Sequence, residues 1–133
     1  MSDLARFHAA QDGVVEGAIA EVAAGAKRGH WMWFVYPQLR GLGRSATAKR
    51  FGIADAAEAR AYLADPVLRD RLGRAVDAAR RHPDPERVFG PLDAVKLRSS
   101  LTLWALVEAH GPWRGALEGL FGAPCPVTVE RLR

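Results

Sequence analysis

The sequence has little that would point to a secreted or membrane-inserted protein. Cys125 is the only cysteine in 133 residues, so an internal disulfide is excluded, and its Pro-Cys-Pro setting offers no second metal ligand. No apolar run approaches the roughly 18 residues of a membrane-spanning helix. The N-terminal residues Met-Ser-Asp-Leu-Ala do not resemble a signal peptide. We therefore expect a cytoplasmic protein that makes no membrane contact.

Acidic residues are missing from a long internal stretch. Between Glu21 and Asp55 there is no Asp or Glu, whereas six Lys or Arg are present. The whole chain carries a formal net charge of +4, with a sequence pI of about 9.8, which favours anionic partners. A charged fraction of 26% and an apolar fraction of 49% are typical of a globular chain. The length predicts one domain over residues 1–133.

Apolar residues recur at helical spacing along most of the chain, and glycine or proline interrupts each run. Helix-start residues precede several runs: Ser45, Asp55 and Asp65 each stand where a capping side chain is needed. The longest run, over residues 92–109, is apolar on nearly every side, which is typical of a central helix. The sequence therefore predicts an all-α, single compact domain of about seven short helices around this central one.

The segment from His30 to Tyr36 is the densest in aromatic residues. Trp31, Trp33 and Phe34 also fall within it, and no partner strand is evident elsewhere, so a short helix or tight turn is expected. So many aromatic side chains cannot stay in water without cost, and the segment is therefore core or the wall of a pocket. The aromatic and basic neighbours of His30 predict a neutral ring. It could serve as an acid or base, stack on a ligand, or be structural.

A loop of the form Gly41-Leu42-Gly43-Arg44-Ser45 leads into the next expected helix. Glycines let backbone N–H groups turn towards a bound anion, and Arg44 supplies a full positive charge. The loop lacks the Gly-Lys-Ser/Thr of a nucleotide-binding P-loop and no βαβ unit surrounds it. The alternative is a simple turn in which Ser45 caps its own helix.

A polar stripe marks the start of the central helix. Lys96 and Ser100 follow Asp93 by three and seven positions, and Ser99 stands next to Ser100. A buried lysine needs a compensating charge, so either Asp93 or a ligand must pair with Lys96 if it lies inside. The stripe therefore either closes a pocket or reaches solvent. A Ser–Lys nucleophile would also fit the pattern.

No metal or cofactor is expected. The four histidines show no i, i+4 pair with a carboxylate, which a zinc site would need. The acidic residues fall mostly on helix faces predicted to be exposed, so no catalytic carboxylate pair can be chosen.

Two motifs carry a family resemblance. His30–Phe34 with Pro37–Gly43, and later Asp93–Ser100, resemble the two signatures of the bacterial family known as domain of unknown function 1810. The resemblance covers essentially the whole chain, and Gly29 departs from it where serine is expected. It implies a mainly helical single-domain fold, but it implies no activity, substrate or catalytic residue. The label calpastatin, which some members carry, does not fit a chain of this composition.

We hypothesise a pocket that binds or processes an anionic, nucleotide-like small molecule. The competing hypotheses are a non-catalytic protein-interaction module, whose basic rim docks an acidic partner, and an RNA- or single-stranded-DNA-binding domain. A monomer is expected in each case, and catalysis is left open. The candidate ligand-binding residues are His30, Trp31, Trp33, Pro37, Gln38, Gly41, Gly43, Arg44, Ser45, Lys96, Ser99 and Ser100.

Overall fold

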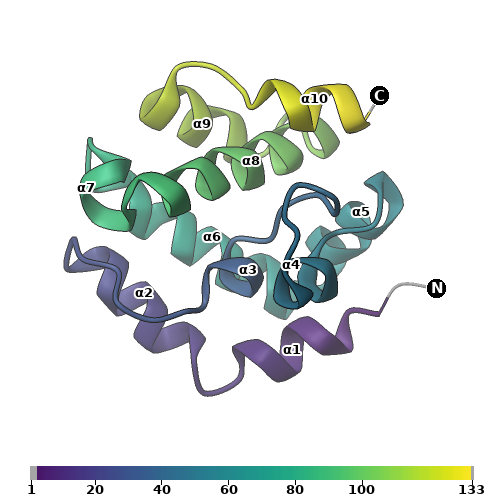
Figure 1. The fold of residues 1–133 in the computed structure, drawn as a ribbon, viewed down its shortest axis with the longest axis horizontal. Coiled ribbons are helices and arrows are strands. Elements are labelled where there is room, and N and C mark those ends of the chain that lie inside the picture. The colour runs from purple at the N-terminus through teal and green to yellow at the C-terminus, as the bar shows by residue number, and fades with distance from the viewer. Residues whose placement is uncertain (1–2, 133) are drawn as a thin grey trace.

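The computed structural model describes residues 3–132, so Met1, Ser2 and Arg133 of the expected domain lie outside the described residues. The described residues form one compact bundle without a β-strand, which confirms the all-α prediction (Figure 1). Ten helices lie between residues 3 and 132, more than the seven expected, because several connections contain short helices. None of them is long and apolar enough to cross a membrane. The helices are α1 (Ala5–Gln11), α2 (Val15–Ala23), α3 (Met32–Val35), α4 (Ala46–Phe51), α5 (Ala56–Ala64), α6 (Pro66–Arg80), α7 (Pro85–Phe89), α8 (Pro91–Val107), α9 (Trp113–Phe121) and α10 (Pro126–Leu132).

The expected capping residues begin their helices. Ser45 Oγ accepts a hydrogen bond from the Ala48 amide at 3.1 Å, and Asp55 Oδ1 accepts one from the Glu58 amide at 2.9 Å. Asp65 Oδ1 accepts from two amides of the first turn of α6, at 3.0 and 3.1 Å. Each bond satisfies an N–H group that a helix leaves unpaired at its start. Helix starts are thus set by residues two or three positions apart.

Helix α8 is the centre of the bundle. It contacts α5, α7, α9 and α10, and Figure 1 shows α9 and α10 on the opposite side of it from α1 and α2. Leu97, Leu101 and Leu103 are fully buried. Trp104 is also fully buried and stacks on Tyr62 with 4.9 Å between ring centroids. The prediction of a central apolar helix is confirmed.

The burial of this central helix is incomplete at its two ends. Leu92 is 79% exposed, Val95 63% and Leu106 43%. The neighbouring helices cover only one side of the first turns of α8, so Leu92 and Val95 face outwards. The helix also ends at Val107, two residues before the expected end.

The aromatic segment folds as the short helix α3, as expected. Its single turn divides the aromatic side chains: Trp31 and Tyr36 are buried, while Trp33 and Phe34 are only partly buried. The Tyr36 hydroxyl donates to the Ala75 carbonyl on α6 at 2.5 Å. The segment is therefore both core and surface, and Trp33 is the indole that stays accessible.

After α3 the chain makes one isolated parallel β-bridge, between Leu39 and Ile53, which the sequence did not predict. The Arg40 amide donates to the Ile53 carbonyl at 2.7 Å, and the Ile53 amide donates to the Gln38 carbonyl at 2.9 Å. The bridge fixes both ends of the connection that contains α4. It holds the backbone of Gln38 in one place.

Candidate functional site

A cavity of about 620 Å³ lies between three parts of the chain: the connection after α3, the start of α8, and α10 with the residue before it. The structure brings Trp33, Gln38, Gly41, Arg44, Lys96 and Ser99 together around it, out of the residues expected at a ligand site. Of the other half of the wall, the sequence pointed only to Leu42, as part of the glycine loop. The remaining lining residues are Leu42, Leu92, Val95, Cys125, Val127 and Arg131.

Lys96 is held by a carboxylate and an indole. Its Nζ lies 2.9 Å from Asp93 Oδ1 and 4.5 Å from the centroid of the Trp33 ring. The other oxygen of Asp93 lies 2.9 Å from Nζ of Lys27, whose side chain is only 8% exposed. Burial opposes ionisation of Asp93, but hydrogen bonds from the two lysines outweigh it and hold the pKa of Asp93 below its ordinary value. The three charged groups together keep one net positive charge beside the cavity.

Two arginines of the cavity wall add to this charge. Arg44 follows the glycine loop and Arg131 lies in the last turn of α10. Within residues 3–132 neither guanidinium takes part in an ion pair. Gly41 has a φ of +98°, and a Cβ there would lie 2.8 Å from Nη1 of Arg131. A side chain at Gly41 would thus displace the Arg131 guanidinium, so this glycine gives the arginine room.

Gln38 is the most unusual polar residue of the wall. It is only 5% exposed, yet its carboxamide has no hydrogen-bond partner among the described residues. The oxygen and nitrogen of the carboxamide are not fully buried atoms, so both reach solvent in the cavity. The carboxamide of this nearly buried residue therefore presents its polar atoms to the cavity and to no described residue, which makes it a candidate ligand-binding group.

Cys125 completes the wall at the start of α10. Its Sγ lies 3.4 Å from Ser99 Oγ, and its amide donates to Thr102 Oγ1 on α8 at 2.9 Å. Burial opposes ionisation of the thiol, but hydrogen bonds from Ser99 and from the start of α10 outweigh it and hold the pKa of Cys125 below that of an ordinary cysteine. Only folding places this residue beside Ser99, 26 positions away in the chain.

Three candidates from the sequence are buried away from the cavity. The indole N–H of Trp31 donates to Glu21 Oε1 at 3.2 Å. Pro37 is buried, and Ser100 is fully buried, where it accepts a hydrogen bond from the Trp104 indole at 3.0 Å. Adjacent residues on a helix point about 100° apart, so Ser99 and Ser100 cannot both face one cavity. The predicted polar stripe is therefore divided between the cavity and the core.

Three others lie at or near the surface without lining the cavity. His30 is exposed and does not line the cavity. Ser45 caps α4, which has only six residues. A Cβ on Gly43 would lie 2.6 Å from Cη2 of Trp33, so this glycine allows close packing of the loop against the indole. Of the expected anion-binding loop, only Gly41, Leu42 and Arg44 reach the cavity.

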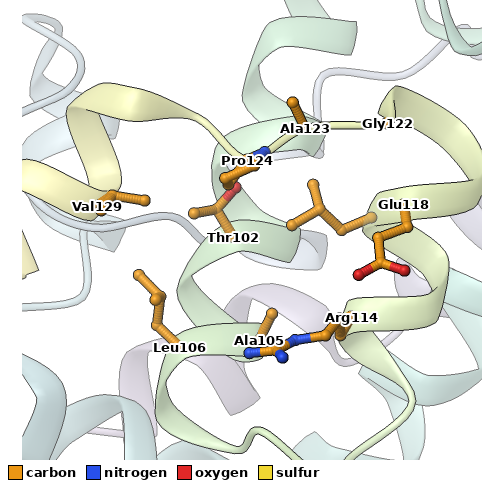
Figure 2. A pocket seen from close by; sticks show the side chains of 10 residues that line it. Thr102, Ala105, Leu106, Arg114, Glu118, Gly122, Ala123, Pro124 and Val129 are labelled. Atoms are coloured by element: carbon orange, nitrogen blue, oxygen red, sulfur yellow. The ribbon is translucent and has the colours of Figure 1, made fainter.

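A second cavity, of about 240 Å³, lies between α8, α9 and the segment leading into α10 (Figure 2). Its wall is mainly apolar, and Arg114 and Glu118 of α9 lie on the same side of it in Figure 2. The one hydroxyl of the wall, on Thr102, donates to the Arg98 carbonyl and accepts from the Cys125 amide. This cavity offers a ligand no unpaired buried polar group, and we do not assign a site to it.

Metal ligands do not converge in the described part of the chain. No group of three or more His, Cys, Asp or Glu side chains there could hold a metal ion.

Comparison with known proteins gives one family and one close structural relative. The model of a family described as "Protein of unknown function (DUF1810)" matches residues 1–132. The crystal structure of the conserved hypothetical protein Rv1873 from Mycobacterium tuberculosis is similar to this fold, with a TM-score of 0.92. The two sequences are 42% identical, and the match covers 98% of this chain and 96% of the other. No curated protein sequence matches this chain.

Proposed function

The chain belongs to the DUF1810 family, as its two motifs indicated, and from this premise we propose that it binds a small anionic molecule in the cavity between α3, α8 and α10. The two motifs that carry the family resemblance provide the Trp33 side and the Lys96 side of the cavity wall. The proposal concerns binding, and it leaves open whether a reaction follows.

One observation carries the proposal: three cationic side chains from three separate elements surround a cavity whose wall contains no acidic residue. Lys96 shares Asp93 with Lys27, and Arg44 and Arg131 have no carboxylate partner in the described structure. Like charges on neighbouring side chains repel one another, and a bound anion would relieve the repulsion that Asp93 leaves uncompensated. The cavity volume of about 620 Å³ lies within the roughly 300–1,000 Å³ typical of small-molecule sites.

The first experiment measures thermal unfolding with inorganic phosphate, ribose 5-phosphate and nucleoside monophosphates at low ionic strength. A ligand at about 100 times its Kd stabilises the folded state by about 2.7 kcal/mol. Cys125 reports where the ligand binds, because it is the only cysteine and lines the cavity. Its lowered pKa favours the thiolate, which is the form that iodoacetamide alkylates. We expect ligands that raise the melting temperature also to slow this alkylation.

Arginine variants test the charge. Arg44→Ala and Arg131→Ala should each weaken binding at least about tenfold, since a hydrogen bond to a charged group contributes about 1.5–3 kcal/mol. Arg60→Ala is the matched control, because Arg60 is exposed on α5 and lines none of this cavity. If none of the probes stabilises the wild-type protein or slows alkylation, the proposed function is wrong.

Exposed apolar residues at the cavity rim favour a second candidate, the docking of an acidic protein segment. Leu92, Val95 and Val127 are 79%, 63% and 50% exposed. A flexible peptide of alternating Glu and Leu would then slow alkylation of Cys125 where small anions do not. A nucleic-acid ligand would instead bind regardless of base identity, with an affinity that falls steeply as salt is added.

A further inference from the structure

The Gln38 carboxamide has a fixed position and a free hydrogen-bonding edge. Its backbone is held by the bridge, in which the Gln38 carbonyl accepts from the Ile53 amide at 2.9 Å. The residue is 5% exposed and lines the cavity, but its side chain bonds to no described residue. One carbonyl oxygen and two N–H groups are therefore open to whatever enters.

Another glutamine of the same chain shows what a structural role looks like. Gln11 is 1% exposed, and its Nε2 donates to the Phe34 carbonyl at 2.8 Å and to the Tyr62 hydroxyl at 3.0 Å. Its Oε1 lies 3.4 Å from Nη1 of Arg71. Gln11 thus joins α1 to α3, α5 and α6 through its side chain. Gln38, which is 5% exposed, forms no side-chain hydrogen bond to another described residue.

The chemistry of a free carboxamide limits what can pair with it. A glutamine side chain presents a donor next to an acceptor in one plane, and it pairs best with a group that has an acceptor next to a donor. The edges of nucleobases have this arrangement, whereas phosphate and sugar phosphates do not. The three cations of the wall would hold a phosphate on the same molecule.

We propose that Gln38 reads the hydrogen-bonding edge of a nucleobase, so that the ligand of this cavity is a nucleoside monophosphate and not a phosphate or sugar phosphate alone. This inference rests on the proposed function and adds the specificity-determining residue. Base recognition and charge recognition then come from different residues: Gln38 determines which base is accepted, and Arg44, Lys96 and Arg131 determine that an anion is accepted.

The test compares AMP, GMP, CMP and UMP with ribose 5-phosphate and inorganic phosphate by isothermal titration calorimetry. We expect at least one nucleotide to bind tenfold or more tightly than ribose 5-phosphate. Gln38→Leu should abolish that difference and keep the affinity for ribose 5-phosphate. A side chain that discriminates by hydrogen bonding loses this ability when it is replaced by an apolar one of similar size.

Stability of the ligand-free protein separates this role from a structural one. Gln38→Leu should leave the melting temperature nearly unchanged, because no hydrogen bond to a described residue is lost. Gln11→Leu, the matched control, should lower it, because two short hydrogen bonds are lost.

Four results would overturn the inference. Ribose 5-phosphate binding as tightly as every nucleotide would remove base recognition and leave the proposed function intact. A Gln38→Leu variant that still discriminates would move recognition to another residue, and one with a strongly lowered melting temperature would make Gln38 structural. Failure of every probe, phosphate included, would overturn the proposed function together with the inference.

Discussion

At the scale of single residues, Asp93 is the carboxylate that compensates two positive charges, because it forms ion pairs with two lysines that differ in burial. The side chain of Lys27 is 8% exposed and that of Lys96 is 27% exposed. Asp93→Asn leaves both ammonium groups without a carboxylate, whereas Lys96→Met leaves the pair with Lys27 intact. We expect Asp93→Asn to lower the free energy of unfolding by about 1–3 kcal/mol and Lys96→Met by less than about 1 kcal/mol. Urea unfolding at neutral pH measures both.

The pH dependence of this difference follows from the sign of the Asp93 shift. A carboxyl whose pKa is lowered by folding stabilises the folded state above its unfolded pKa, and the contribution is lost as pH falls through the folded pKa. The penalty of Asp93→Asn should therefore be full at pH 7 and shrink below about pH 4, near the ordinary aspartate pKa. A penalty that stays constant down to pH 2 would contradict the assignment.

At the scale of helices, α1 and α5 are joined by a buried ion pair. Arg6 Nη2 lies 2.8 Å from Glu58 Oε1, and each side chain is 7% exposed. Arg6 also donates to the carbonyls of Arg50 and Gly52, at the end of α4. Burial opposes ionisation of Glu58, but hydrogen bonds from Arg6 and the Ala54 amide outweigh it and hold the pKa of Glu58 below its ordinary value. The side chain of Arg6 therefore connects α1 to α4 and α5.

Removing one partner of this pair should cost far more than removing an exposed pair. We expect Arg6→Met or Glu58→Gln to lower the free energy of unfolding by about 3–5 kcal/mol. Each variant removes one charge of the pair and leaves the other buried without a counter-ion. Glu16→Gln is the control: it breaks an exposed ion pair with Arg74, worth about 0–1 kcal/mol. The double variant Arg6→Met/Glu58→Met should lose less than the sum of the single losses, as measured by a double-mutant cycle. Additive losses would mean that the two side chains act independently.

At the scale of the whole molecule, one core runs through the described chain. Trp31 lies just before α3, Trp104 in α8 and Trp113 in α9. All three belong to the same buried cluster. A domain of this size with one core should unfold in a single cooperative step. We therefore expect tryptophan fluorescence and far-UV circular dichroism to give the same urea midpoint. Two separate midpoints would mean that the helices form two units.

The sequence by itself determined that the fold is helical and where several of its helices begin. Ser45, Asp55 and Asp65 begin their helices through bonds to amides two or three residues ahead, so the information lies within one turn of chain. The central position of residues 92–109 also followed from composition, since a helix without a broad polar face must be covered by others. Capping depends on residues within one helical turn, and the burial of a helix depends on how apolar its residues are on average. Both can be read directly from the sequence.

The tertiary structure alone decided which side chains meet at the cavity. No sequence pattern places Cys125 beside Ser99 or Arg131 beside Gly41, because these contacts depend on how α10 packs against α8. Nor could it separate Ser99, which faces the cavity, from Ser100, which is bonded to a core indole. The unpaired state of Gln38 is a property of its surroundings and of no residue near it in the chain. A site made of long-range contacts depends on packing geometry to within a few ångströms, and that geometry is fixed only when the whole core closes.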